Sequence, residues 1–243
     1  MFTATPLNQK GIYEGYPTSL GTKNRKWENR PFIENAVIAF IGASVPKQIA
    51  DEVVMRSLDK STKIINLCIP AKDINEWKDP TSSVWSHADN TLESLGITRE
   101  EVNVVWTMQD DLRGGKDFPD SPLALRDKLV ELIGVVEDYF PNLKQIDLAS
   151  RTYNFTPTVT KHSEPSCYYT GWANKWTVEQ FRKRYPIFIN DRCYLWTDGL
   201  QPNGTMQTTP EQYKEDLIHY SAEGITYWGG KVFDYYSRFL WFV

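Results

Sequence analysis

The strongest constraint on the fold is a repeated alternation of short apolar runs with longer segments of helical spacing. Five apolar runs predict strands at 35–44, 62–70, 101–108, 143–150 and 192–198. Helical spacing follows at 45–58, 82–96, 121–142, 172–186 and 221–242. Runs without regular polar alternation are typical of parallel strands that are buried on both faces. The sequence therefore predicts an α/β fold, with helices covering both faces of a parallel sheet.

The domain organisation predicted from this pattern is simple. With 243 residues the chain is long enough to bury a substantial core, and it contains neither an internal repeat nor a clear linker. Residues 1–35 have no periodicity and are predicted to be an irregular N-terminal extension packed on a single domain of residues 36–243. The formal charge of −4 argues against a nucleic-acid partner that binds through bulk basicity.

Metal, disulfide and membrane motifs are missing from the sequence. Three irregularly spaced cysteines and three scattered histidines match no disulfide framework and no zinc pattern, so we expect no metal and no cofactor. We also expect no signal peptide and no membrane span. These patterns leave the oligomeric state open, and they leave the compartment open between cytoplasm, a mature secreted form and a virion.

Ser44 follows the first predicted strand at a sharp turn. In parallel α/β sheets the ligand site lies beyond the carboxyl ends of the strands. A serine at this turn can present its hydroxyl as a nucleophile, and its backbone N–H can stabilise an oxyanion. The alternative is that Ser44 caps the helix at 46–57, in which Pro46 takes an early position. Local propensity alone favours the cap.

Asp216 and His219 form an Asp-x-x-His pair before the last predicted helix. A turn between them would let the carboxylate accept a hydrogen bond from one ring nitrogen while the other nitrogen faces a serine. The imidazole would then take the serine proton and return it to the leaving group. The alternative is a surface pair that is adjacent by chance, because this spacing is common.

Four segments carry a family resemblance: SRTYN (150–154), EPSCYYTGWANKW (164–176), YLWTDGLQP (194–202) and DLIHYSAEGITYWGGKV (216–232). Together with a serine on the first turn, their order resembles the SGNH (GDSL-like) esterases and lipases, and in particular a group of bacterial, often secreted SGNH-like proteins. The resemblance implies a flavodoxin-like three-layer α/β/α sandwich of about five strands. It also implies Ser44 as nucleophile, with Asp216 and His219 as its partners, and ester hydrolysis without a cofactor.

Two oxyanion positions depart from the pattern of that family. Its second block usually supplies a glycine N–H, whereas this chain has Pro70 and Ala71, of which only Ala71 can donate. Its third block usually supplies an asparagine, and Asp111 falls there. A carboxylate accepts hydrogen bonds and repels a developing oxyanion. Gln109 could donate its amide instead.

Arg151 follows the fourth predicted strand. It could bind a substrate carboxylate or a sugar hydroxyl, or it could form an ion pair with Glu164 or a nearby aspartate. Four aromatic residues could either stack on a sugar ring or pack in the core: Tyr153, Tyr168, Trp172 and Trp196.

Two hypotheses follow from the sequence. The first is a serine esterase that hydrolyses O-acyl esters of a small molecule or glycan, with O-acetyl groups on carbohydrate as the leading case. The second is a catalytically weakened or inactive module with the same fold, which recognises a glycan or forms part of a virion. A nucleotide-binding protein is disfavoured, because no glycine-rich phosphate loop follows a strand.

Overall fold

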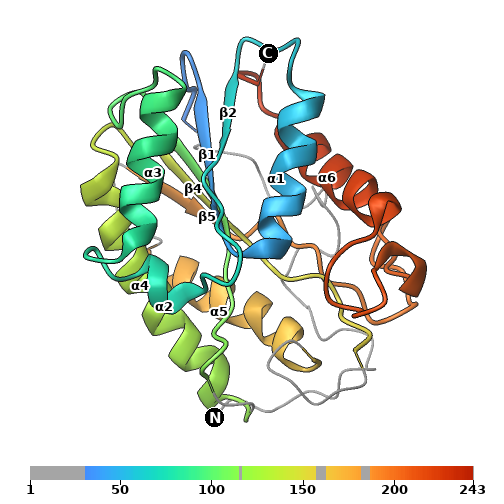
Figure 1. Cartoon of the computed structure of the whole chain (residues 1–243). Coiled ribbons are helices and arrows are strands. Elements are labelled where there is room, and N and C mark those ends of the chain that lie inside the picture. Colours follow the sequence, from blue (N-terminus) through green and yellow to red (C-terminus); the bar gives the residue numbers. More distant parts are fainter. Residues whose placement is uncertain (1–30, 115–116, 157–162, 182–186, 243) are drawn as a thin grey trace.

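One five-stranded sheet organises the protein, and all of its neighbouring strands run parallel in the order β2-β1-β3-β4-β5 (Figure 1). The strands are β1 (Val37–Gly42), β2 (Lys63–Asn66), β3 (Val104–Met108), β4 (Gln145–Ala149) and β5 (Phe188–Asn190). The computed structural model describes residues 31–114, 117–156, 163–181 and 187–242. Most of the predicted extension at 1–35 therefore lies outside the described residues. The strand order is the flavodoxin-like one, as expected.

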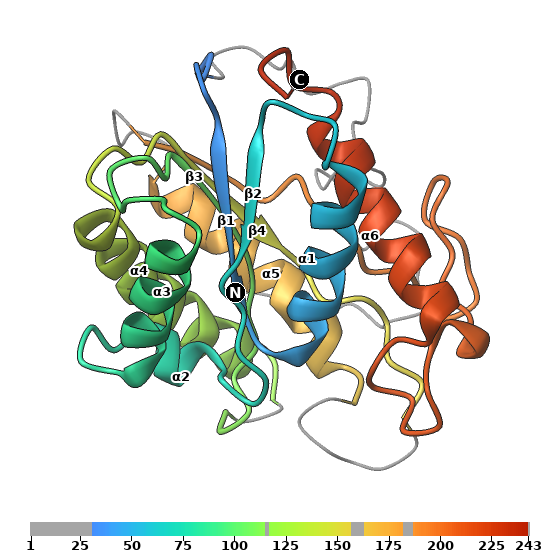
Figure 2. The same cartoon turned by 45° about the horizontal axis from the view of Figure 1, so that its top comes forward.

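Helices cover both faces of the sheet (Figure 2). They are α1 (Ser44–Arg56), α2 (Ile74–Trp77), α3 (Ser83–Ser94), α4 (Asp120–Tyr139), α5 (Ser166–Phe181) and α6 (Ala222–Tyr236), with a 3₁₀ turn η1 (Pro210–Gln212). Helices α1 and α6 lie side by side on one face, and α3 and α4 lie on the other (Figures 1 and 2). The parallel sheet covered on both faces, which the alternation predicts, and the three-layer α/β/α sandwich, which the resemblance implies, are both confirmed.

The residues of β1 alternate between the two cores, which explains why the whole strand is apolar. Phe40 packs in the core shared with α1 and α6, whereas Ala39 and Ile41 pack in the core shared with α3 and α4. All three side chains are fully buried. Successive side chains of a strand point to opposite faces, so a strand covered on both sides buries its side chains at every position and favours apolar residues.

Glycines allow α6 to approach α1 closely. A Cβ atom at Gly229 would lie 2.4 Å from Cγ of Glu52 in α1. The adjacent glycines 229 and 230, which weaken the sequence prediction for this helix, are therefore tolerated because the close helix contact stabilises it.

A buried polar cluster joins α6 to the sheet. Asp147 of β4 is fully buried and accepts hydrogen bonds from Gln145, Asn190, Tyr235 and Tyr236. The two tyrosine hydroxyls lie 2.9 and 2.8 Å from its carboxylate oxygens. Burial raises the pKa of Asp147, and the hydrogen bonds from Gln145, Tyr236, Asn190 and Tyr235 oppose that rise. We call these five residues the Asp147 cluster.

Three predicted elements need correction. The expected strand at 192–198 is wrong: the fifth strand is β5, and the following run belongs to no strand, with only an isolated bridge from Asp198 to Gln201. Residues 193–197 of this run are buried, and the backbone N–H groups of Leu195 and Trp196 donate to Ser150 Oγ, so an apolar run packed outside the ladder resembled a strand. Helix α5 begins at Ser166, before the predicted 172, and the last helix ends at Tyr236 rather than 242. The short helix α2 was not predicted.

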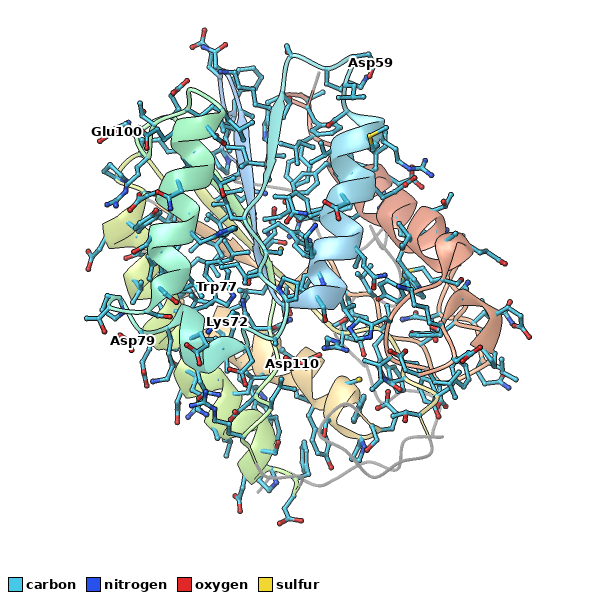
Figure 3. The ribbon with its side chains drawn as sticks, viewed as in Figure 1. Asp59, Lys72, Trp77, Asp79, Glu100 and Asp110 are labelled. Carbon is cyan, nitrogen blue, oxygen red and sulfur yellow. The ribbon has the colours of Figure 1, made fainter. Side chains whose placement is uncertain are left out.

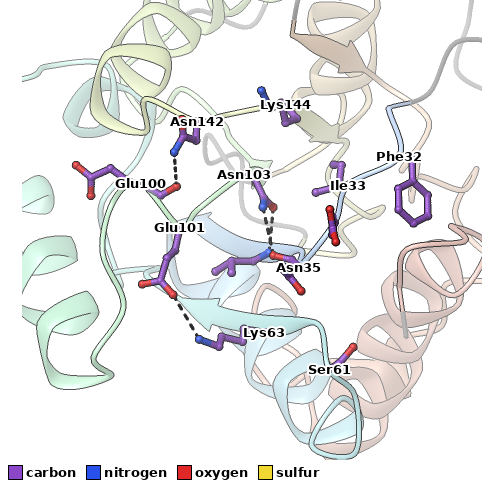
Figure 4. A pocket seen from close by; sticks show the side chains of 12 residues that line it. Phe32, Ile33, Asn35, Ser61, Lys63, Glu100, Glu101, Asn103, Asn142 and Lys144 are labelled. Atoms are coloured by element: carbon purple, nitrogen blue, oxygen red, sulfur yellow. Dashed lines mark hydrogen bonds and ion pairs between the residues drawn. The ribbon is translucent and has the colours of Figure 1, made fainter.

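The two ends of the sheet differ in character. Figure 3 shows Asp110 at the end where α1 begins, and Glu100 and Asp59 at the opposite end. A pocket of about 650 Å³ opens at that opposite end, beside the first residues of β1 and β2, with Asn103 in its wall (Figure 4). The predicted site residues lie instead at or beyond the carboxyl ends of the strands, where parallel sheets bind ligands. Among the described helices, none has the length and apolarity needed to cross a membrane.

Candidate active site

Ser44 is the first residue of α1, directly beyond the turn that leaves β1. Gly42 has φ of +148°, and a Cβ atom there would lie 2.6 Å from Pro46 Cγ. Glycine is therefore needed for this strand-to-helix turn. The alternative role of Ser44 as a helix cap is not observed, because the N-cap residue is Ala43 and no side chain caps the helix. The serine hydroxyl is directed to a different partner.

That partner is His219, which lies 175 positions later in the chain. Ser44 Oγ is 2.8 Å from His219 Nε2, and His219 Nδ1 is 2.6 Å from Asp216 Oδ2. An ionised carboxylate can only accept, so Nδ1–H donates to Asp216 and Nε2 accepts the serine hydroxyl proton. The His219 and Asp216 side chains are 36% and 45% exposed, so this hydrogen-bonded chain opens to solvent.

Asp216 shapes the loop that presents the histidine. Its Oδ1 accepts the backbone N–H groups of Ile218 and His219, each at 2.9 Å, which forms an Asx-type turn. Leu217 has φ of +53°, a left-handed conformation that is rare for a branched side chain and common at functional sites. Partial burial raises the pKa of Asp216, but the hydrogen bonds from His219 and Ile218 outweigh it and lower the pKa to about 2. The carboxylate is therefore ionised at neutral pH.

The loop at 213–220 is anchored at its base. Tyr213 and Tyr220 pair in an antiparallel bridge, and both hydroxyls lie within 2.9 Å of Thr152 Oγ1, just beyond β4. On its other side, Gln48 of α1 hydrogen-bonds both the backbone N–H and the backbone C=O of Tyr220. The loop is thus tied to the sheet and to the helix that carries Ser44.

Ala71 lies next to the Ser44 turn. The Ile69 N–H donates to the Gly42 carbonyl at 2.9 Å, and Lys72 N–H donates to the Ile69 carbonyl, which closes a turn through Pro70 and Ala71. Ala71 has φ of +62°. Glycine is favoured in this conformation, and an alanine there costs roughly 1 kcal/mol. The backbone therefore keeps the conformation of a glycine although the residue is alanine.

Asp111 is held in a network of hydrogen bonds. Lys128 of α4 lies 2.5 Å from one carboxylate oxygen, and Asn75 of α2 donates to the other at 2.9 Å. Burial raises the pKa of Asp111, but these two donors outweigh it and lower the pKa below its ordinary value. Asp111 is therefore an ionised acceptor whose charge Lys128 balances, and it cannot itself donate to an oxyanion.

Gln109 and Arg151 are buried. The Gln109 amide donates to Thr107 Oγ1 at 2.9 Å, and its side chain lies inside the fold. Arg151 is ion-paired with Asp110, and its side chain is only 5% exposed. Desolvation lowers the pKa of Arg151, but the charge of Asp110 outweighs it and raises the pKa above its ordinary value. Of the two alternatives for Arg151, the ion pair is observed, with Asp110 rather than Glu164 as its partner.

The aromatic residues considered for sugar stacking divide into two groups. Tyr168 and Trp196 are 3% and 1% exposed, so they serve packing, whereas Tyr153 and Trp172 are partly exposed. Glu164 lies beneath this group and accepts a hydrogen bond from Trp196 Nε1 at 3.1 Å. Burial raises the pKa of Glu164 to about 7.

Sequence reasoning missed several residues that organise the site. Gln48 and Lys128 lie outside the motifs, and Thr152 lies inside the SRTYN segment but was given no role; each acts through one or two contacts with residues far away in the chain. A weak signal was available for Gln48, because it lies one helical turn after Ser44 and so shares its face of the helix.

Comparison with known proteins gives structural matches only. No family model matches this chain, and no curated protein sequence matches it either. A protein of Slackia heliotrinireducens proposed to be an SGNH hydrolase superposes with a TM-score of 0.54, at 11% identity, over 83% of this chain and 98% of that one. A carbohydrate esterase of family 3 from Talaromyces cellulolyticus gives 0.51, at 11% identity, over 82% and 95%. A carbohydrate acetylesterase of Sinorhizobium meliloti gives 0.50, at 14% identity, over 83% and 97%.

These matches cover nearly the whole length of each similar protein. The chain therefore has the fold of the SGNH (GDSL-like) hydrolases, and the predicted resemblance is confirmed at the level of the fold. At 11–14% identity the likeness extends to the architecture alone.

Proposed function

We propose that this protein is a serine esterase of the SGNH type that hydrolyses O-acyl esters. The observation that carries the proposal is the continuous chain of hydrogen bonds from Ser44 through His219 to Asp216. A serine activated by an oriented histidine is the arrangement that acyl transfer requires.

The first half-reaction forms an acyl-serine. Ser44 Oγ attacks the ester carbonyl carbon while its proton passes to His219 Nε2. The tetrahedral intermediate collapses as the carbon–oxygen bond to the alcohol breaks, and the imidazolium gives its proton to the departing oxygen. Asp216 keeps Nδ1–H oriented and stabilises the charged ring throughout.

The second half-reaction releases the acid and restores the serine. Water attacks the acyl carbon while His219 takes one of its protons. Collapse of the second tetrahedral intermediate breaks the bond to Ser44 Oγ, which recovers its proton from His219. The protonation of all three groups after one turnover is the same as at the start, so no cofactor is needed.

Two backbone groups are suited to stabilise the oxyanion. Ser44 stands in the first turn of α1, where backbone N–H groups lack partners within the helix. The turn through Ala71 adjoins the Ser44 turn. The backbone N–H of Ala71 is therefore the second donor that we propose. The negative charge of Asp111 is balanced by Lys128, which reduces its repulsion of an oxyanion. Roles in substrate binding for Gln109 and Arg151 stay predictions.

The substrates that we propose are small acyl groups on carbohydrate, with acetyl esters first. The partly exposed rings of Tyr153 and Trp172 provide apolar faces that suit sugars. Two similar structures are named as a carbohydrate esterase and a carbohydrate acetylesterase, which supports this choice as an analogy of fold.

A second candidate function is favoured by the third oxyanion position. Asp111 cannot donate, and the Gln109 amide is bonded to Thr107. Loss of one oxyanion donor typically lowers turnover about 10²–10³-fold. A protein weakened in this way would serve as a binding or structural module that retains the esterase fold.

The test compares the wild type with Ser44→Ala and Ser94→Ala, using aryl acetate hydrolysis and labelling by a fluorophosphonate. Ser94 is an exposed serine of α3 and serves as the matched control. We expect turnover to fall about 10⁶-fold in Ser44→Ala and to be unchanged in Ser94→Ala. Mass spectrometry should find the phosphonyl adduct on the peptide that contains Ser44.

Two results would reject the esterase. Turnover that persists in Ser44→Ala would exclude this serine as the nucleophile. A wild type that neither cleaves aryl acetates or acetylated sugars nor reacts with the fluorophosphonate would favour the binding module.

A further inference from the structure

The serine and the histidine reach each other from elements that are far apart in the sequence. Ser44 belongs to α1, whereas His219 belongs to the loop before α6. Their contact of 2.8 Å therefore depends on how firmly that loop is held against α1. A displacement of about 1 Å in such a contact can cost about 10²-fold in rate.

Gln48 makes the direct connection between these two elements. Its Oε1 accepts the Tyr220 N–H at 3.0 Å, and its Nε2 donates to the Tyr220 carbonyl at 3.0 Å. The side-chain amide thus satisfies both backbone groups of the residue that follows His219. Gln48 is partly buried and stands one helical turn after Ser44, on the same face of α1.

We propose that Gln48 is a positioning residue that sets the distance between Ser44 and His219. The proposal rests on the esterase function proposed above. Thr152 ties the loop to the sheet through the hydroxyls of Tyr213 and Tyr220, and Lys214 N–H donates to the His219 carbonyl within the loop, but none of these bonds reaches α1. Two hydrogen bonds from one rigid amide group oppose a shift of the loop along α1, because a movement of Tyr220 along the helix would lengthen at least one of them.

Asn103 provides a matched control at the other end of the sheet. Its side-chain amide also bridges two backbone groups, accepting from the Val37 N–H at 3.0 Å and donating to the Asn35 carbonyl at 3.3 Å (Figure 4). Removing either amide takes away the same kinds of hydrogen bond. Of the two amides, only that of Gln48 joins the helix that carries Ser44 to the loop that carries His219.

The experiment measures kcat, KM, thermal midpoint and the rate of fluorophosphonate labelling for Gln48→Ala, Gln48→Met, Gln48→Glu and Asn103→Ala. We expect Gln48→Ala and Gln48→Met to lower kcat and the labelling rate roughly 10–100-fold with KM little changed. Gln48→Glu keeps the acceptor for Tyr220 N–H but loses the donor, so its kcat should be intermediate. Both alanine variants should lower the thermal midpoint by roughly 3 °C, and Asn103→Ala should keep its kcat.

Hydrogen exchange gives a readout that is independent of turnover. In Gln48→Ala the amides of Ile218, His219 and Tyr220 should exchange faster than in the wild type, and in Asn103→Ala they should not. A kcat loss in Gln48→Ala no larger than in Asn103→Ala, or unchanged exchange at these amides, would overturn the proposal. An inactive, unlabelled wild type would instead reject the esterase, and exchange alone would still decide whether Gln48 holds the loop.

Discussion

Asp216 and Asp147 are both aspartates that accept several hydrogen bonds near α6, yet their surroundings are opposite. Asp216 is 45% exposed and accepts from two backbone N–H groups and one imidazole. Asp147 is fully buried and accepts from four side chains. Their pKa values shift in opposite directions, down to about 2 for Asp216 and upward for Asp147.

This difference separates a carboxylate that orients an imidazole from a cluster that joins the sheet to the last helix. The partners of Asp216 come from within three residues, so the turn forms locally and keeps one ring nitrogen of His219 fixed. The partners of Asp147 come from β4, β5 and α6, so this cluster forms only when the sheet and the last helix assemble. Substitution of Asp216 should therefore affect catalysis, and substitution of Asp147 should affect stability.

The largest effect is expected for Asp216→Asn. The asparagine side chain can accept or donate at the His219 contact, so the ring loses its fixed tautomer, and kcat/KM for an aryl acetate should fall roughly 10³–10⁴-fold. The free energy of unfolding should fall by less than about 1 kcal/mol, because solvent screens the half-exposed pair and the asparagine Oδ1 still accepts both backbone N–H groups. Asp127→Asn, at an exposed aspartate of α4, is the control. Similar activity for both variants would contradict the role of Asp216.

The next largest effect is expected for Asp147→Ala. Gln145, Asn190 and Tyr236 would lose the acceptor that Asp147 provides, whereas the Tyr235 hydroxyl keeps Asn190 Oδ1. The free energy of unfolding should therefore fall by about 4 kcal/mol, and the thermal midpoint by roughly 10 °C. Urea unfolding followed by circular dichroism measures the free energy of unfolding. Asp127→Ala should change stability by less than about 0.5 kcal/mol. Activity per folded molecule should be retained in Asp147→Ala. A loss of kcat without a loss of stability would contradict the structural role of Asp147.

A smaller effect is expected from pH. Because the folded pKa of Asp147 is raised, its contribution to stability is present below its ordinary pKa of about 4 and is lost as pH rises through the folded value. The folded pKa of Asp216 is lowered, so its contribution is present above about 4 and is lost as pH falls through about 2. Urea midpoints from about pH 4 to pH 9 should fall more in the wild type than in Asp147→Asn. Parallel pH profiles would contradict this sign.

The smallest effect is expected for Ala71→Gly. Glycine adopts the positive φ of this position without strain, so the free energy of unfolding should rise by about 1 kcal/mol while the proposed N–H donor stays in place. Ala124→Gly, at an exposed residue of helix α4, should instead lower the free energy of unfolding by about 1 kcal/mol. Urea unfolding of both variants, with turnover measured in parallel, checks the sign. Loss of turnover in Ala71→Gly would show that the alanine methyl group itself matters.

Much of the architecture could be predicted from local pattern. The largely apolar runs that became β1 and β3 predicted buried parallel strands, because a strand covered on both faces has no exposed side. The run at 192–198 also has an apolar centre, from Cys193 to Trp196, yet it forms no ladder although that centre is buried. Apolar composition indicates that a segment is buried. Whether the segment also pairs with a neighbouring strand depends on its position in the folded chain.

The sequence by itself determined the order of the layers and the candidate residues Ser44, Asp216 and His219, because periodicity and short motifs are written in neighbouring positions. Tertiary structure alone decided the remainder. It directs the Ser44 hydroxyl to His219 rather than to a helix cap, ties Asp111 to Lys128 and Arg151 to Asp110, and makes Gln48 a support for the histidine loop. Each of these is a contact between distant segments, and its energy depends on distance and burial that only the folded chain defines.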